Sequence, residues 1–276
     1  MNAWMGTSGY SYPDWVGVFY PPGTRSGQML PYYCSAFPLV ELNFTFYRSP
    51  TAAMLTRIAD NTPDKFQFIV KLPRSLSHEQ RTGDLASFRD AVSELRRRKQ
   101  LMGLLCQMPP SAHYDKKSLK WLQTLGKELS DMRLAIELRH RSWWREDLPQ
   151  WMADHHLDLV SVDVPDLPAL FPRGWIQSSS RAYVRLHSRS AKSWYGGGQK
   201  RYDYHYSDGE LNEWIDAMIA AREQTEEVLF LFNNCYRGQA IDNARRLHEL
   251  IEERTAFPVV PPFAEPPPQQ RSLFDS

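Results

Sequence analysis

The sequence predicts an α/β protein, a single (β/α)8 TIM-like barrel. Short apolar runs recur along the chain, and most are followed by a segment with helical periodicity. This alternation is expected when parallel strands are joined by crossover helices. The chain length of 276 residues is close to the roughly 250 residues typical of one such barrel. These observations favour one large barrel domain.

Eight apolar runs are the predicted strands, and each ends in a polar residue that could take part in chemistry. They cover residues 4–8, 40–43, 66–71, 101–107, 134–139, 157–163, 182–187 and 228–234. In a closed parallel barrel the carboxyl ends of all strands meet on one face. We therefore expect the polar strand ends to form the site, namely Glu41, Lys71, Glu137, Asp163, His187 and Asn233.

The helical segments support the barrel independently of the strands. From Leu211 onward apolar residues recur at the spacing of one helix face. Just before them, Ser207 and Glu210 have the spacing of a capping box. The pattern recurs in the last helix, from Ile241, and Ser49 before Pro50 is typical of a helix start. Prolines and serines interrupt residues 165–180, so the sixth crossover is expected to be irregular.

Composition limits the function classes only weakly. The formal net charge of +1 gives no overall attraction to nucleic acid or anionic membranes. The three cysteines are odd in number and widely spaced, which argues against a disulfide framework and a cysteine zinc site. No apolar run approaches the roughly 20 residues of a membrane span. We expect a cytoplasmic protein with reduced thiols and no membrane partner.

Several stretches together resemble the YecE-like family, DUF72, a family of TIM-barrel domains of unknown function. They are GTSGYSYPDWVGVFYP, VELNFTFYRSP, FIVKLPRSLSH, LLCQMPPS, AIELRHRSWW, YVRLHS with the later RYDYHYS, and LFNNCYRGQAIDNA. The resemblance spans nearly the whole chain and implies the barrel fold. It implies no substrate or reaction, so function is argued from the site.

Three carboxylates, Glu41, Glu137 and Asp163, stand at the ends of three different predicted strands. We expect them to face one cavity and, with Lys71 and His187, to form the catalytic group. Paired carboxylates at such a mouth suit general acid and base catalysis, as in glycoside hydrolysis. The alternative is a structural ion network in which one or more of them pairs with Lys71, Arg139 or Arg185.

Side chains alternate between the two faces of a strand, so residues two positions from a carboxylate lie on its side of the strand. Asn43 lies on the side of Glu41, and Arg139 on the side of Glu137. Both are predicted substrate-binding residues, as is Tyr47. The same carboxylates with His187 could also hold a divalent metal ion. No HExxH or CxxC motif occurs, so the metal and its identity stay open.

Basic and amide groups at the last two strands suggest an anionic ligand. Arg185 and His187 end the seventh strand, and Asn233 and Asn234 end the eighth, just before a helix. Barrels often bind phosphate at this place. The alternative is that the asparagines cap the helix and that Arg185 neutralises Asp163.

A segment rich in glycine, aromatic and basic residues follows the seventh strand, over residues 188–206. The glycines would make this segment mobile, and its aromatic and basic side chains could contact a ligand, so we predict that it is a lid over the site. Trp194 and Tyr195, together with Trp143, are predicted to stack on sugar rings or bases. The alternative is that the aromatic side chains only pack on the barrel rim.

The barrel domain is predicted over residues 1–257, and a proline-rich flexible tail over 258–276. The tail resembles the short bacterial peptide that binds the DNA sliding clamp, with Gln270, Leu273 and Phe274 as partner-binding residues. Such anchors on an extended spacer suit docking into a preformed groove. The alternative is that Leu273 and Phe274 pack back on the barrel.

A clamp-tethered enzyme acts on DNA or nucleotides, and tethering offsets weak intrinsic affinity. We therefore expect a hydrolase for a phosphoester or a nucleic-acid-related substrate, with the carboxylates activating water or holding a metal. The first alternative is a carbohydrate-active barrel that uses paired carboxylates. The second is a non-catalytic protein that binds a small anion or nucleotide.

Overall fold

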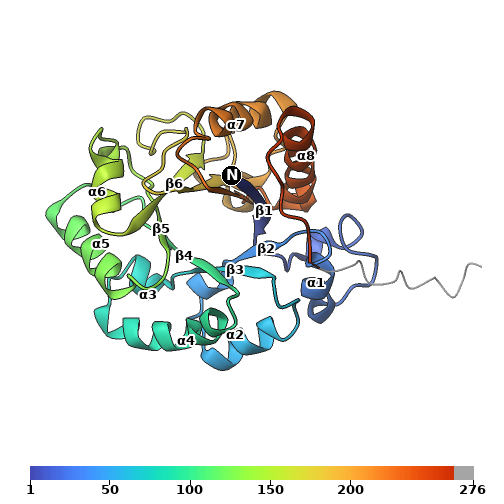
Figure 1. Ribbon diagram of the computed structural model, residues 1–276, viewed down its shortest axis with the longest axis horizontal. Helices are drawn as coiled ribbons and strands as arrows, with labels where there is room; N and C mark the ends of the chain where they lie inside the picture. Colours follow the sequence, from blue (N-terminus) through green and yellow to red (C-terminus); the bar gives the residue numbers. More distant parts are fainter. Residues whose placement is uncertain (264–276) are drawn as a thin grey trace, which may run out of the picture.

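Eight parallel strands close into a barrel in strict sequence order, in a computed structural model that describes residues 1–263 (Figure 1). The partner-binding residues predicted in the tail, Gln270, Leu273 and Phe274, lie outside this range. The strands are β1 (Asn2–Ser8), β2 (Leu39–Leu42), β3 (Gln67–Lys71), β4 (Leu101–Gln107), β5 (Leu134–Glu137), β6 (Leu157–Asp163), β7 (Arg181–Leu186) and β8 (Glu227–Phe232). The predicted (β/α)8 fold is confirmed.

The helices form the outer ring around the strands (Figure 1). They are α1 (Ser26–Tyr33), α2 (Ala52–Ala59), α3 (Arg74–Ser77), α4 (Leu85–Arg97), α5 (Lys116–Glu128), α6 (Leu148–Asp154), α7 (Asp208–Ala220) and α8 (Gln239–Arg254). The stripe on α7 is buried through Leu211, Trp214 and Ile215. The predicted capping box is present, since Ser207 accepts from the backbone of Glu210 and the Glu210 side chain accepts from Ser207.

One predicted helix start is wrong by two residues. The α2 helix begins at Ala52, and its N-cap is Thr51 rather than Ser49. The Thr51 hydroxyl accepts a hydrogen bond from the backbone N–H of Met54 at 3.2 Å. Pro50 therefore precedes the cap, because a hydroxyl that satisfies a free N–H of the first turn fixes the start more strongly than the proline does.

The sixth crossover is irregular, as the sequence predicts: no helix lies between β6 and β7. Serines stabilise this segment. Ser161 donates to the carbonyl of Ile176 at 2.7 Å, and Ser178 donates to the carbonyl of Leu157 at 2.7 Å. These hydrogen bonds hold the segment along β6 without a helix.

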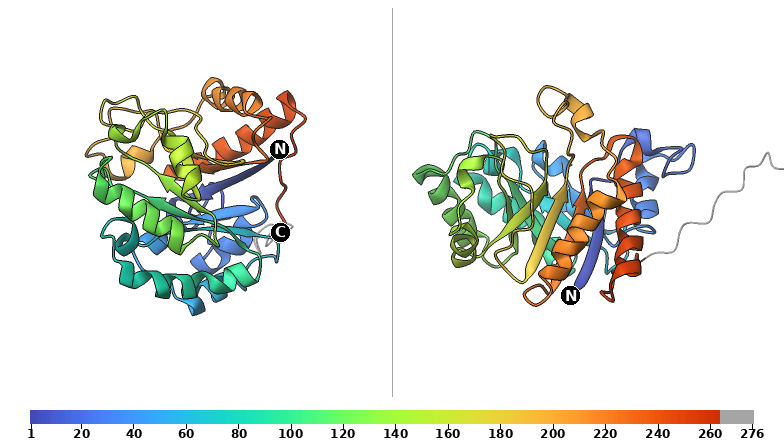
Figure 2. Two further views of the ribbon diagram at one scale, coloured as in Figure 1. Left: turned by 60° about the vertical axis from the view of Figure 1, so that its left-hand side comes forward. Right: turned by 90° about the horizontal axis from the view of Figure 1, so that it is seen from above.

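Strand register decides which side chains enter the barrel, because paired positions on parallel strands point to the same side. Ser8 pairs with Glu41, Gln107 with Glu137, and Val162 with Arg185. The interior of the carboxyl end is therefore mostly polar. Figure 2 shows the segment between β7 and α7 rising above the barrel at the end opposite the N-terminus.

No helix in the described part of the chain is long and apolar enough to span a membrane.

Candidate functional site at the carboxyl end of the barrel

A single arginine, Arg185, joins the two carboxylates inside the carboxyl end of the barrel. Its Nε and Nη2 donate to the two oxygens of Glu41 at 2.9 and 2.6 Å. Its Nη1 donates to Oε2 of Glu137, and Nη2 also donates to the Ser8 hydroxyl at 3.1 Å. Arg185, Glu41 and Glu137 are at most 1% exposed. The two carboxylates thus share one buried cation.

Both carboxylates accept further contacts, and these include the one oxygen that Arg185 does not reach, Oε1 of Glu137. Tyr183 donates to Oε2 of Glu41 at 2.5 Å. Oε1 of Glu137 accepts from the Gln107 amide at 2.9 Å and lies 2.5 Å from Nε of Arg139. Burial alone would raise the pKa of Glu137, but Arg139 and Arg185 outweigh burial and hold that pKa well below its usual range. This carboxylate is ionised and has no oxygen free.

Lys71, at the end of β3, has a different environment. Its Nζ donates to the neutral amide oxygen of Gln107 at 2.5 Å and lies 5.0 Å from the centre of the Phe46 ring. No carboxylate in residues 1–263 lies within ion-pair distance of this amine. Burial, followed by the Arg185 guanidinium, lowers the pKa of Lys71 to about 8. About one tenth of the amine is therefore neutral at pH 7, and about half at pH 8.

His187 is a neutral imidazole in this cluster. The Asn233 amide nitrogen lies 2.8 Å from Nδ1, so Nδ1 accepts and the proton is on Nε2. Nε2 lies 3.5 Å from Oε1 of Glu137, and the Trp194 ring packs edge-on against the imidazole. Burial lowers the pKa of His187 to about 4, so the ring carries no charge at pH 7.

We call this set of side chains the mouth cluster. It comprises Ser8, Glu41, Asn43, Lys71, Gln107, Glu137, Arg139, Arg185, His187 and Asn233. Its formal charge is +1 when Lys71 is protonated, because two carboxylates face two guanidiniums and one ammonium. Of the nine buried side-chain polar atoms without a hydrogen bond in residues 1–263, three belong to it: Asn43 Oδ1, Arg139 Nε and His187 Nε2.

The expected convergence includes Glu41, Lys71, Glu137, His187 and Asn233, but not Asp163. Asp163 follows Val162, which shares the inward side of Arg185, so Asp163 points outward toward α7. There it accepts from Trp214 Nε1 at 2.6 Å and from Arg189 Nη2 at 2.8 Å. Burial raises its pKa. Its cation is thus Arg189, not Arg185.

Two further predicted site residues have structural contacts away from the mouth cluster. Trp143 is fully buried, and its indole N–H donates to the carbonyl of Ala112 at 2.7 Å, so its faces are not available for stacking. Asn234 donates to the carbonyl of Tyr204 and to Oδ1 of Asn243. Because it alternates with Asn233, it points away from the barrel axis. It ties the segment after β7 to α8.

The remaining aromatic candidates surround the cluster to different degrees. Trp194 is 2% exposed and lies between His187 and the guanidinium of Arg201, which is 5.2 Å from its ring. Tyr195 and Tyr47 are 62% and 86% exposed. Tyr47 packs edge-on against Phe46, the residue above Lys71. Trp194 is therefore a wall of the cluster, while Tyr47 and Tyr195 have free surface for a ligand.

Four members or neighbours of the cluster were missed by sequence reasoning. Ser8 and Gln107 end the first and fourth predicted strands, so their positions carried the same signal as Glu41. Tyr183 lies two residues before Arg185 and therefore shares its side of the strand. Phe46, in contrast, lies in a short 3-10 turn after β2, and no sequence pattern aims it at Lys71.

The sequence did not decide whether the site binds a metal ion, and the arrangement of the potential ligand side chains tests this. Within residues 1–263 no group of three or more His, Cys, Asp or Glu side chains is arranged to hold a metal ion. Glu41 and Glu137 direct their oxygens at Arg185, and Asp163 lies outside the cluster. The described side chains therefore do not fit a metal bound by these carboxylates.

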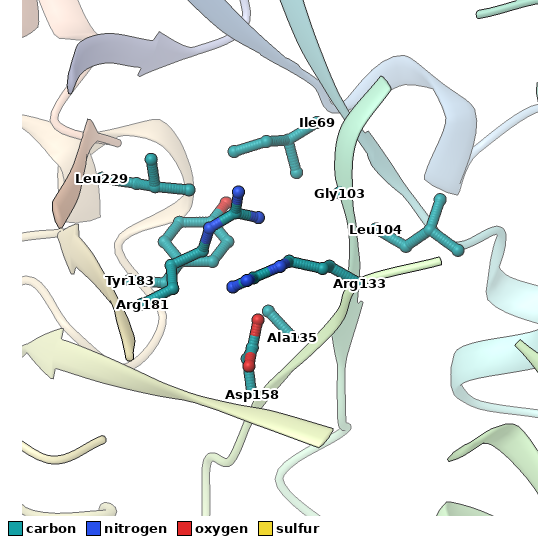
Figure 3. Close-up of a pocket in the computed structure, with 9 residues that line it drawn as sticks. All are labelled: Ile69, Gly103, Leu104, Arg133, Ala135, Asp158, Arg181, Tyr183 and Leu229. Atoms are coloured by element: carbon teal, nitrogen blue, oxygen red, sulfur yellow. The ribbon is translucent and has the colours of Figure 1, made fainter. Parts of the chain in front are cut away.

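A second polar layer lies deeper in the barrel, toward the strand amino ends. Figure 3 shows Arg133, Arg181, Asp158 and Tyr183 around a cavity whose volume is about 10 Å³. That space holds about one water molecule. Arg181 Nη1 donates to the carbonyl of Met102 at 2.7 Å, and Nη2 to Glu227 at 3.0 Å. This layer fills the barrel and is too small for an organic ligand.

The chain belongs to the DUF72 family. The family model described as "Protein of unknown function DUF72" matches residues 4–270. The UPF0759 protein YunF of Bacillus subtilis is 29% identical over an alignment of 275 positions, and the match covers 90% of this chain and 94% of that protein. The family resemblance inferred from the sequence motifs is therefore confirmed.

Crystal structures of family members have the same fold. A DUF72 family protein from Thermotoga maritima is 35% identical, with a TM-score of 0.83 over 91% of this chain and 100% of that one. A DUF72 family protein from Enterococcus faecalis is 24% identical, with a TM-score of 0.81 over 91% of this chain and 95% of that one. The second likeness concerns the fold alone.

Replacing Arg185 should be costly, because Arg185→Met leaves Glu41 and Glu137 buried without their shared cation. We expect the free energy of unfolding, measured by urea denaturation, to fall by about 3–5 kcal/mol. The control is Arg97→Met, since Arg97 is 72% exposed where it pairs with Glu94, and such pairs contribute at most about 1 kcal/mol. Equal effects of the two variants would show that the buried pairing is not important for stability.

Proposed function

We propose that this protein is an enzyme that binds a small organic phosphate or carboxylate at the mouth cluster, with Lys71 transferring a proton in the reaction. The observation that carries the proposal is a buried lysine amine with a lowered pKa and no carboxylate within ion-pair distance in residues 1–263, near Arg139, which pairs with Glu137 through Nε and leaves Nη1 and Nη2 without hydrogen bonds in that range. A phosphoester, the substrate class expected from the sequence, is one member of this class.

The charge and hydrogen-bonding state of the cluster support an anionic ligand. Nη1 and Nη2 of Arg139 make no hydrogen bond to any residue in 1–263, and the Arg139 side chain is 11% exposed. His187 Nε2 is buried and makes no hydrogen bond of good geometry in residues 1–263, since the carboxylate oxygen that faces it, Oε1 of Glu137, lies 3.5 Å away. Unsatisfied buried donors cost about 1–3 kcal/mol each. An anion between these groups would satisfy them and offset the +1 charge.

The state of Lys71 supports proton transfer. Proton transfer is most efficient when the pKa of the group lies near the working pH, and the pKa of Lys71 is lowered to about 8. Gln107 holds the amine in place, because the same amide donates to the ionised Glu137 and accepts from Lys71. Lys71 keeps this hydrogen bond whether it is charged or neutral, since both forms donate.

The carboxylates have a supporting role in this proposal. A water-activating or sugar-protonating carboxylate needs a free oxygen, whereas the oxygens of Glu41 and Glu137 accept from Arg185, Tyr183 and Gln107. This geometry disfavours the carbohydrate-active alternative. It also shifts the acid and base role in a hydrolase from Glu41 and Glu137 to Lys71. The other alternative, a non-catalytic protein that binds a small anion, would use the same binding site but would not turn the ligand over.

Anion binding is tested by thermal unfolding with phosphate, citrate or chloride at equal ionic strength. We expect phosphate or citrate to stabilise the wild type by about 2.7 kcal/mol at 100 times its dissociation constant. Arg139→Ala should lose this effect, while Arg141→Ala, which changes an exposed arginine two residues away, should keep it. Stabilisation that is the same in Arg139→Ala and in the wild type would refute the anion site.

Catalysis is tested with a panel of aryl phosphates and phosphorylated sugars. We expect Lys71→Met to reduce turnover by about 100-fold or more, the usual size of a proton-transfer contribution. Turnover that survives in Lys71→Met would refute the role of Lys71. Ligand binding without turnover of any panel member would favour the non-catalytic protein.

Recruitment to the DNA sliding clamp through Gln270, Leu273 and Phe274 is proposed from the sequence alone. A fluorescent peptide of residues 264–276 should bind the clamp of the same organism with micromolar affinity by fluorescence polarisation. The doubly substituted peptide, Leu273→Ala with Phe274→Ala, should not bind, since both apolar anchors are lost. Absence of binding by the unsubstituted peptide would remove the link to DNA substrates.

A further inference from the structure

Lys71 is the one lysine of the chain that is not on the surface. The other eight lysines are Lys65, Lys99, Lys116, Lys117, Lys120, Lys127, Lys192 and Lys200, and all of them are exposed. Lys71 itself is 9% exposed and extends from the end of β3 into the barrel mouth. Its amine therefore has an environment that no other lysine of this chain has.

The contacts around Nζ keep the amine available as a nucleophile. Its hydrogen-bond partner is the neutral Gln107 amide, and one side is covered by the apolar Phe46 ring. Burial disfavours the ammonium form most, and the Arg185 guanidinium disfavours it next, whereas Glu41 and Glu137 each have a weaker, opposite effect on the pKa. A carboxylate at this place would instead have kept the amine protonated and unreactive.

We propose that Lys71 forms a Schiff base with the carbonyl group of a small anionic aldehyde or ketone whose phosphate or carboxylate is bound by Arg139. This inference rests on the proposed function, since it uses the same anion site. The inference adds to the proposed function a carbonyl group on the anionic substrate and a covalent bond between that group and Lys71.

The step needs no oxidant or reductant. The lone pair of the neutral Lys71 amine attacks the carbonyl carbon, the carbonyl π electrons move to oxygen, and one proton passes from nitrogen to that oxygen. The resulting carbinolamine loses its hydroxyl group as water, with a proton lost from nitrogen, and a carbon–nitrogen double bond forms. One amine and one carbonyl thus give one imine and one water.

The remaining groups are suited to such a ligand. Arg139 presents Nη1 and Nη2, a planar pair of donors that matches a carboxylate or phosphate. His187 Nε2–H is a neutral, buried donor, which suits the carbonyl oxygen because it adds no charge. Arg139, His187 and Gln107 all meet at Oε1 of Glu137, so the anion and carbonyl contacts lie within one small volume.

The experiment is reductive trapping on the full-length protein at pH 8. Glyoxylate and pyridoxal 5′-phosphate, two anionic aldehydes, are added with sodium cyanoborohydride, and the modified lysines are identified by peptide mass spectrometry. The eight exposed lysines are the internal control. At this pH about half of the Lys71 amine is neutral, because its pKa is lowered to about 8.

We expect the initial labelling rate of Lys71 to exceed that of any exposed lysine by at least 10-fold. Phosphate should compete, and Arg139→Ala should reduce labelling of Lys71 while leaving the exposed lysines unchanged. Propanal, an aldehyde without an anionic group, should show little preference for Lys71. Lys71→Arg, which keeps a long cationic side chain, should lose the selective adduct, with circular dichroism reporting on its fold.

Labelling of Lys71 no faster than that of the exposed lysines would overturn the inference. Equal labelling of Lys71 by propanal and glyoxylate would overturn the assignment of an anionic substrate. These failures are distinguishable from failure of the proposed function. Stabilisation by phosphate that depends on Arg139, without selective trapping, would leave the anion site intact and remove only the covalent step.

Discussion

The site depends on one interaction, the pairing of Arg185 with both Glu41 and Glu137 inside the barrel. Burying two carboxylates costs several kcal/mol each unless a cation with matching geometry accompanies them. A guanidinium can donate to both at once, and in this fold Arg185 reaches Glu41 on β2 and Glu137 on β5 from β7. It thereby joins three strands that are far apart in the sequence.

This pairing determines what the neighbouring groups can do. Because Glu137 is held ionised, it orients Gln107, and Gln107 in turn orients Lys71. Because Glu41 and Glu137 direct their oxygens at Arg185, and Glu137 also pairs with Nε of Arg139, Lys71 has no carboxylate within ion-pair distance in residues 1–263, and Arg139 keeps Nη1 and Nη2 for a ligand. The carboxylates thus build the site, whereas the amine and the second guanidinium are left for chemistry.

Much of the fold and part of the site could be predicted from the sequence. The strands and the α7 capping box follow from local periodicity and short-range hydrogen bonds, and polar strand ends identified Glu41, Lys71 and Glu137. Asp163 shows the limit. Its direction depends on the register between β6 and β7, and a shift of one residue turns a side chain to the opposite face. The pairing of Asp163 with Arg189, and of Arg185 with Glu41 and Glu137, joins residues far apart in the sequence, so no local sequence pattern predicts these ion pairs.

The central claim is that Lys71 is a buried amine with no carboxylate partner among residues 1–263, and a direct measurement is its titration by nuclear magnetic resonance. The wild-type protein would carry lysine labelled with ¹³C at Cε, and Lys71→Arg would identify the Lys71 signal. As the pH rises, the Lys71 amine should lose its proton with a midpoint near the pKa of about 8. A midpoint at the ordinary value of about 10.4 would contradict the account.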